Sequence, residues 1–264
     1  MFSQIITDFW RAPLVDGEVL HQDGSLVVVR DAALPEDRRV TVLTTTAGAE
    51  GAASTILVAL TPGVADALRL TGRDDLTEAA VRQALRDAQI TLHEADCVFH
   101  WSEEARAELL AEADEPGVRR LTAKDADAFA AFEASASERD LDDAYVELDH
   151  WAVFGAFAGG RLVSAASMYP WAGSRLADTG VLTLPELRGQ GHARRVVRAI
   201  SRYAYSQGHE PQYRCQVGNT ASRALAVRAG PGETGPRALR RSCGSCRGAA
   251  PTWRRSRRGR GPSR

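Results

Sequence analysis

The spacing of apolar and polar positions divides the first part of the chain into alternating strands and helices. Short runs rich in β-branched residues predict strands over 25–31, 39–45, 55–60 and 97–101. Apolar positions that repeat every three to four residues predict helices over 74–88 and 103–112. Residues 1–114 are therefore expected to form an α/β unit, which ends at the Ala-Asp-Glu-Pro stretch over 113–116.

The second part, residues 115–230, has a denser pattern of strands. We expect strands over 118–121, 151–157, 161–169, 177–184 and 212–217, and a hairpin at Ala158-Gly159-Gly160. Helices are expected after Thr122, whose spacing from Asp125 favours a capping box, and over 192–206 and 220–229. The order β-α-α-β-β-β-α-β-α predicts an α+β domain with a mixed, mostly antiparallel sheet flanked by helices.

Composition changes this picture in few places. A hydrophobic content of 44% and a charged content of 25% are typical of a globular protein. No apolar run is long enough to span a membrane, so no membrane partner is expected, and the N-terminus lacks the features of a signal peptide, which favours a cytoplasmic location. The Cys-x-x-Cys at Cys243 and Cys246 has no second ligand pair, so no metal is expected.

The formal net charge of −1 conceals an uneven distribution. Residues 231–264 contain ten arginines and one acid, Glu233, with almost no apolar periodicity. This pattern predicts a basic, low-complexity, disordered tail. One hypothesis is that the reading frame is shifted after Gly230. The alternative is a genuine tail that contacts nucleic acid, which is not favoured because it rests on the tail alone.

The most specific pattern is the turn LRGQGHARR, residues 187–195, between a predicted strand and a predicted helix. The first amides of a helix lack partners and lie at the positive end of its dipole. Gly189 and Gly191 allow the main chain to approach a ligand closely, and Arg188 adds a positive charge. The Gly-Lys-Ser/Thr of a P-loop is absent, and Arg194 stands where a Rossmann turn has its third glycine. The turn therefore predicts a phosphate or pyrophosphate site of another kind.

Arg188-x-x-Gly191-x-Ala193 resembles the R/Q-x-x-G-x-G/A signature of the GNAT superfamily of acetyl-CoA-dependent N-acetyltransferases. The order of elements before and after this turn agrees with that family. The resemblance implies a GNAT fold for residues 115–230. Residues 1–114 would be an accessory α/β domain, for which a degenerate copy of the same fold is one option, and residues 231–264 would be an atypical C-terminus.

The resemblance also implies where acetyl-CoA binds. The pantetheine arm would lie along the main chain of Val181, Leu182 and Thr183. Asn219 and Ser222 would lie near the cofactor, although a helix N-cap is an equally good interpretation of Asn219. The diphosphate would bind the main-chain amides of Arg188, Gly189, Gln190, Gly191, His192 and Ala193.

The implied reaction is direct attack of a primary amine on the thioester in a ternary complex. Asp178 is the candidate base. The family's tyrosine, seven residues beyond Asn219, is replaced by Ala226. Either Tyr213 or a water would then protonate the thiolate, or the step needs no acid. This replacement favours the alternative function, a non-catalytic acyl-CoA-binding or regulatory module. The acceptor is unidentified, and a homodimer is compatible with the resemblance. Acidic residues that would attract a cationic acceptor are Glu138, Asp140, Asp142, Asp143, Glu147 and Asp149.

Overall fold

The computed structural model describes residues 2–35, 39–46, 54–73, 75–232 and 236–242. Its first strands are β1 (Glu18–Gln22), β2 (Leu26–Arg30), β3 (Val40–Thr46), β4 (Ser54–Leu60) and β5 (Asp96–His100). The later strands are β6 (Val118–Arg120), β7 (Ala152–Ala158), β8 (Arg161–Pro170), β9 (Leu176–Thr183), β10 (Glu210–Gln216) and β11 (Pro236–Ser242).

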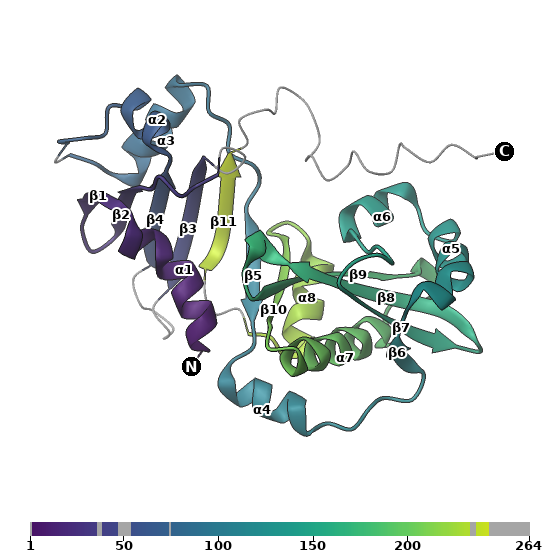
Figure 1. Cartoon of the computed structure of the whole chain (residues 1–264). Helices are drawn as coiled ribbons and strands as arrows, with labels where there is room; N and C mark the ends of the chain where they lie inside the picture. Colours follow the sequence, from purple (N-terminus) through teal and green to yellow (C-terminus); the bar gives the residue numbers. More distant parts are fainter. Residues whose placement is uncertain (1, 36–38, 47–53, 74, 233–235, 243–264) are drawn as a thin grey trace.

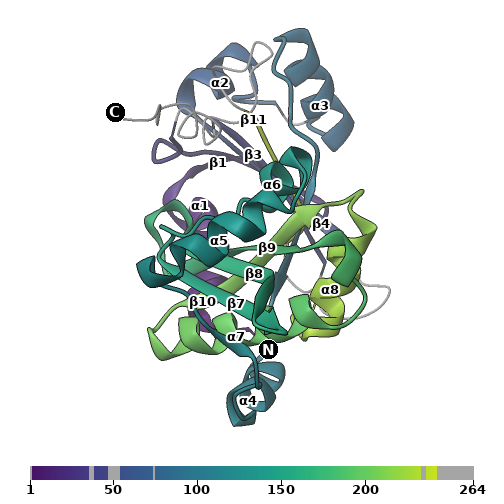
Figure 2. The same cartoon turned by 90° about the vertical axis from the view of Figure 1, so that its right-hand side faces the viewer.

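The helices lie on both faces of these strands (Figures 1 and 2). The first four are α1 (Gln4–Asp16), α2 (Pro62–Ala67), α3 (Glu78–Asp87) and α4 (Glu103–Ala111). The last four are α5 (Ala126–Ala134), α6 (Glu138–Ala144), α7 (His192–Ser206) and α8 (Thr220–Ala229). The helices predicted over 192–206 and 220–229 are confirmed at both ends.

The described strands form one sheet in the order β1-β2-β4-β3-β11-β5-β10-β9-β8-β7-β6. Only β2/β4 and β9/β10 pair in parallel within this described part. The sheet is therefore mixed and mostly antiparallel, which confirms the predicted fold class.

The N-terminal strands are buried on both faces. Leu26 and Val28 of β2 pack toward α2 and α3, whereas Val27 and Val29 pack with α1. This explains the continuous apolar run of β2, because a strand covered on both faces has no polar side. The helix predicted over 74–88 begins later, at an N-cap where the hydroxyl of Thr77 accepts from the amide of Ala80.

The C-terminal strands show the same layering. In β8, Leu162 and Ala165 face the cluster that contains α5 and α6, while Ala166 and Met168 face α7. The capping box at Thr122 and Asp125 is confirmed, with both reciprocal hydrogen bonds present. The hairpin between β7 and β8 is also present, with Gly159 and Gly160 at positive φ.

Two strands join the halves in a way that local patterns did not predict. β5, which precedes the expected boundary at residue 114, pairs antiparallel with β10 over five residues. β11 lies inside the segment expected to be a disordered tail, and it pairs with β3 and at one position with β5. Pairing uses the main-chain carbonyl of every residue and the N–H of every residue but proline, so an apolar pattern is not needed to form it. The expected tail over 243–264 lies outside the described residues.

Candidate functional site

The sheet opens between β9 and β10. Their parallel pairing ends at Thr179 and Tyr213. Beyond that point Gly180–Thr183 stay paired with β8, whereas Arg214–Gln216 continue against β5. An edge of β9 is thus left without a neighbouring strand among the described residues. Such an edge offers main-chain donors and acceptors to a ligand, and Val181, Leu182 and Thr183 lie on it.

A glycine turn follows this open edge. Gly189 has φ 80° and Gly191 has φ 82°, in the left-handed region that favours glycine. Gly191 is the N-cap of the 15-residue α7 and provides no side-chain cap. A Cβ atom at either glycine would meet nothing within 4 Å, so the turn borders open space. The first amides of α7 therefore have room for an anionic group.

The side chains of the turn are engaged elsewhere. Arg188 donates from Nε to the carbonyl of Thr183 at 3.2 Å and pairs with Asp140 of α6 at 3.0 Å. His192 is buried and accepts from the guanidinium of Arg195 at Nδ1, 2.7 Å away. Burial and the charge of Arg195 lower the pKa of His192. What the turn offers a ligand is therefore mainly its main chain, and the predicted cofactor contacts there stay predictions.

At the start of α8 the two predicted residues have separate roles. Asn219 caps the helix, because its side-chain oxygen accepts from the amide of Ser222 at 3.0 Å. The hydroxyl of Ser222 lies 2.7 Å from that of Tyr213 on β10. Burial raises the pKa of Tyr213 above its usual range, and its ring packs in the cluster that contains Ala226. A protonated hydroxyl therefore lies beside the point where β9 and β10 separate.

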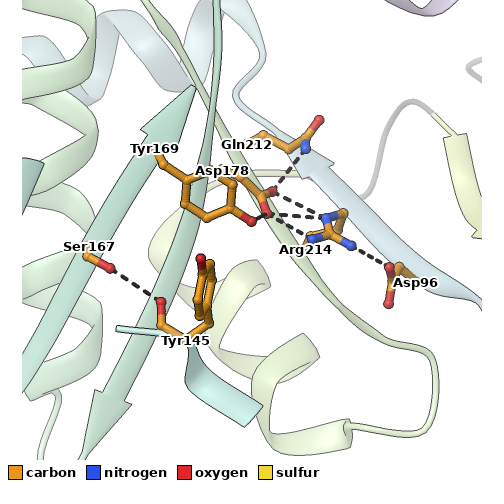
Figure 3. Close-up of polar contacts among 7 residues, drawn as sticks. All are labelled: Asp96, Tyr145, Ser167, Tyr169, Asp178, Gln212 and Arg214. Carbon is orange, nitrogen blue, oxygen red and sulfur yellow. Dashed lines mark hydrogen bonds and ion pairs between the residues drawn. The ribbon is translucent and has the colours of Figure 1, made fainter. Parts of the chain in front are cut away.

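Asp178, the candidate base, lies in a closed polar network (Figure 3). Its side chain is buried, with a relative exposure of 4% for the residue. Tyr169 donates to it at 3.0 Å, Gln212 at 2.9 Å and Arg214 at 2.9 Å. Arg214 also pairs with Asp96 of β5 at 2.6 Å. These three donors occupy the carboxylate oxygens, so the contacts of Asp178 favour a structural role; the catalytic role stays a prediction.

Three rings lie on the same face of the sheet as Asp178. Tyr145 contacts His150 and Tyr169 edge-on, with centroids 4.8 and 5.5 Å away, and His150 lies 5.2 Å from Tyr169. The Nδ1 of His150 is 2.8 Å from the hydroxyl of Ser167. Burial lowers the pKa of His150. Sequence reasoning missed this cluster, because the contacts depend on the pairing of β7 with β8 rather than on a local motif.

Gly180 fixes how closely this cluster approaches the open strand. A Cβ at Gly180 would lie 2.2 Å from the carbonyl oxygen of Ala144 and 2.9 Å from that of Tyr145. The last turn of α6 therefore rests directly on β9, at the first residue beyond the pairing with β10. Only glycine permits this contact without displacing α6.

A family comparison decides the assignment. Residues 92–230 match the model of the Acetyltransferase (GNAT) family. The chain belongs to this family. The GNAT match starts before the expected boundary at residue 114 and includes β5, in agreement with the pairing of β5 and β10. No curated protein matches the sequence closely enough to count as a relative.

Solved structures of GNAT proteins also resemble the chain. A putative GNAT acetyltransferase from Novosphingobium aromaticivorans is 20% identical, with a TM-score of 0.46 over 58% of this chain and 64% of that one. A GNAT acetyltransferase from Colwellia psychrerythraea is 20% identical, with a TM-score of 0.45 over 64% and 63%. A GCN5-related N-acetyltransferase-like protein from Streptococcus suis is 13% identical, with a TM-score of 0.43 over 80% and 86%. The chain thus spans less than two thirds of the length of the first two.

Two further observations concern cofactors and membranes. Among the described residues, no group of three or more His, Cys, Asp or Glu side chains is placed to hold a metal ion. Within the same part of the chain, no helix is both long enough and apolar enough to cross a bilayer.

Proposed function

We propose that this GNAT protein is an N-acetyltransferase that transfers the acetyl group of acetyl-CoA to a primary amine. The observation that carries the proposal is the separation of β9 from β10 immediately before the glycine turn. The open edge at Val181–Thr183 would hold the pantetheine arm, and the amides of Arg188–Ala193 would hold the diphosphate. Two contacts support this co-substrate: Nε of Arg188 lies 3.2 Å from the carbonyl oxygen of Thr183 at the end of the open edge, and Gly189 and Gly191 border open space.

In the proposed reaction the amine attacks the thioester carbonyl in a ternary complex, and the C–S bond breaks as the C–N bond forms. The amine loses a proton and the departing thiolate gains one. The hydroxyl of Tyr213 is the proposed proton donor to the thiolate, since it lies where the strands separate and stays protonated. It would take the place of the tyrosine that the family has at the position of Ala226.

The acceptor is proposed to be cationic. Its entrance would be lined by α6 and the loop that follows, which carry the acidic residues predicted from the sequence. Asp140 is paired with Arg188, and Asp143 lies 3.6 Å from Arg139. Glu147 and Asp149 lie near enough to Tyr145 to raise its pKa, after the larger effect of burial. The six acids outnumber these two arginines, and the net negative charge that remains would attract an ammonium group.

A second function, binding of acyl-CoA without catalysis, is favoured by one observation. Ala226 is fully buried against the cluster of Tyr213, so α8 offers no hydroxyl at the position of the family's tyrosine. A regulatory module would retain the open edge and the glycine turn but would not need a proton donor.

Two measurements test the proposal. Calorimetry with acetyl-CoA should show binding at a single site, and release of free CoA thiol should occur when a primary amine from a panel of diamines, polyamines and amino sugars is added. Binding without thiol release from any amine would favour the regulatory module. The absence of binding to folded protein would refute both functions.

A further inference from the structure

We propose that His150 is the base that accepts the proton of the attacking amine, held in place by Ser167 and Glu147. This inference rests on the proposed acetyl transfer and assigns its proton acceptor. It replaces Asp178, whose oxygens already accept from Tyr169, Gln212 and Arg214.

The register of the sheet places His150 beside the open strand. Ser167 of β8 pairs with Gly180 of β9, the first residue beyond the pairing with β10. Neighbouring strands lie about 4.8 Å apart. His150 bonds the hydroxyl of Ser167 at 2.8 Å, on the face where Gly180 meets the end of α6. The imidazole is therefore one strand away from the point at which the proposed pantetheine site begins.

The contacts of Ser167 are compatible with the tautomer of His150 that this role requires. The Ser167 hydroxyl donates to the carbonyl oxygen of Tyr145, 3.5 Å away (Figure 3). Its oxygen is then available to accept from an N–H at Nδ1 of His150. In the proposed resting state the proton of the neutral ring is on Nδ1, which leaves the lone pair of Nε2 for the proton of the amine.

Glu147 is placed to stabilise the product of the proton transfer. Its Oε2 lies 3.8 Å from Nε2 of His150, which is longer than a hydrogen bond but within ion-pair distance. The side chains are 10% and 21% exposed, so solvent screens the pair weakly. Protonation at Nε2 would create an imidazolium, and the nearby carboxylate would stabilise its positive charge.

The titratable groups around the imidazole agree with this role. Asp149 and Glu147 face it from its own loop, Tyr145 from the end of α6, and Tyr169 from β8. Burial lowers the pKa of His150, and the charge of Asp149 opposes that effect without cancelling it. The ring is therefore neutral near pH 7 and able to accept a proton.

The step is balanced within the proposed reaction. The amine nitrogen forms the C–N bond, and its proton moves to Nε2 of His150. The C–S bond breaks with its electron pair on sulfur, which takes a proton from Tyr213 or solvent. His150 then returns its proton to solvent, so no oxidant, reductant or further reactant is needed.

The test compares His150→Gln with wild-type protein and with His209→Gln as a matched control. The ring of His209 contacts Trp151 with centroids 4.5 Å apart, and Trp151 packs on the α7 side of the sheet, opposite to His150. We expect His150→Gln to lower kcat by roughly 100-fold or more, the range of a general base, with little change in the Kd of acetyl-CoA. The wild-type kcat should fall below pH 6.5 as His150 is protonated. This fall, the acidic limb of the pH–rate profile, should be absent from His150→Gln. His209→Gln should retain both kcat and the limb.

The outcomes separate this inference from the proposed function. If wild-type protein releases no thiol with any amine, the proposed function fails. If wild-type protein is active and His150→Gln keeps its kcat within about threefold, or Asp178→Asn abolishes the acidic limb instead, the assignment of His150 is overturned. Should His150→Gln fail to fold, His150→Ala with added imidazole decides, because free imidazole restores activity only if the ring acts as a base.

Discussion

Each half of the molecule contains a strand that pairs in parallel with a neighbour and leads into a helix. In the described residues, β4 of the N-terminal half has neighbours on both edges, whereas β9 of the C-terminal half has one edge that is partly unpaired. In the N-terminal half, β4 is paired along its length with β3 and over five residues with β2. It leads through Thr61 into the six-residue α2, which begins with Pro62 and Gly63. In the C-terminal half, β9 pairs with β10 over four residues, and the two strands then separate before the 15-residue α7.

This difference shows that the layering of helices on a sheet does not by itself make a ligand site. Pro62 has no amide hydrogen, so it removes one donor from the start of α2. Gly189 and Gly191 keep every donor at the start of α7 and add the backbone freedom to direct them outward. Matched changes in the two halves therefore separate what the layering contributes from what the open strand and the glycine turn contribute.

The largest effect should follow removal of Arg214, which joins the halves through Asp96 and Asp178. Arg214→Leu leaves two carboxylates without their partner in a buried setting and should lower the free energy of unfolding by about 3–5 kcal/mol. Urea denaturation measures this loss. In the N-terminal half, Arg73→Leu breaks an exposed pair with Asp75 and should leave the urea midpoint of unfolding unchanged. Equal midpoints for the two variants would mean that the buried pairs do not hold the halves together.

The second effect is a pH dependence centred on His100, where α1 meets β5. His100 is fully buried and accepts from Trp10, and burial lowers its pKa to about 4. The unfolded chain binds a proton near pH 6.5 and the folded chain does not, so stability falls as the pH drops from 6.5 to 4. The expected loss is about 3 kcal/mol.

Denaturation across this pH range measures the slope of stability against pH. His100→Gln keeps an acceptor for Trp10 but cannot titrate, so its slope should be smaller than that of wild type. The exposed His93→Gln serves as control and should keep the wild-type slope. A slope in His100→Gln as steep as in the wild type would exclude His100 as its source.

The third effect contrasts two glycines that lie at the start of a helix. Gly191 has positive φ, so Gly191→Ala should cost about 1–2 kcal/mol and weaken acetyl-CoA binding about tenfold. Gly63 lies within α2 and has open space at its Cβ, so Gly63→Ala should instead stabilise the fold by about 0.5–1 kcal/mol. Thermal melts and calorimetry give both values. Similar acetyl-CoA affinities for the two variants would argue against the turn as the diphosphate site.

The smallest effect compares two helix caps. Thr77 caps α3 and Asn219 caps α8, so each change to alanine should cost about 1 kcal/mol of stability. Asn219→Asp should restore the cap, because aspartate accepts the same hydrogen bond. If Asn219 also contacts acetyl-CoA, Asn219→Ala should weaken binding and Thr77→Ala should not. An unchanged affinity for acetyl-CoA in both variants would mean that Asn219 acts only as a helix cap.

Local patterns predicted much of the fold and little of the side-chain chemistry. The bounds of α7 and α8, the hairpin before β8 and the capping box at Thr122 depend on neighbouring residues, so periodicity and turn chemistry were enough. The position of β5 beside β10 and the formation of β11 depend on pairing between distant segments, which a local pattern does not encode.

The same distinction applies to the site. The glycine turn could be predicted because its function depends on main-chain conformation within a few residues. The partners of Asp178 could not, since Arg214 lies 36 residues away and meets it only through the register of β9 and β10. His150 was missed for the same reason, because Ser167 reaches it from the neighbouring hairpin strand.

The pairing of β5 with β10 has a consequence for biosynthesis. Asp96 and Arg214 are 118 residues apart, so β5 leaves the ribosome long before its neighbour in the sheet exists. Its other neighbour, β11, is made later still, so until then both edges of β5 are unpaired and its residues Cys97, Val98 and Phe99, which are buried in the folded protein, are exposed. Contacts at such sequence separation slow folding. The nascent chain therefore passes through a stage in which an apolar strand is available to other chains, and aggregation during expression should be most sensitive to changes in β5.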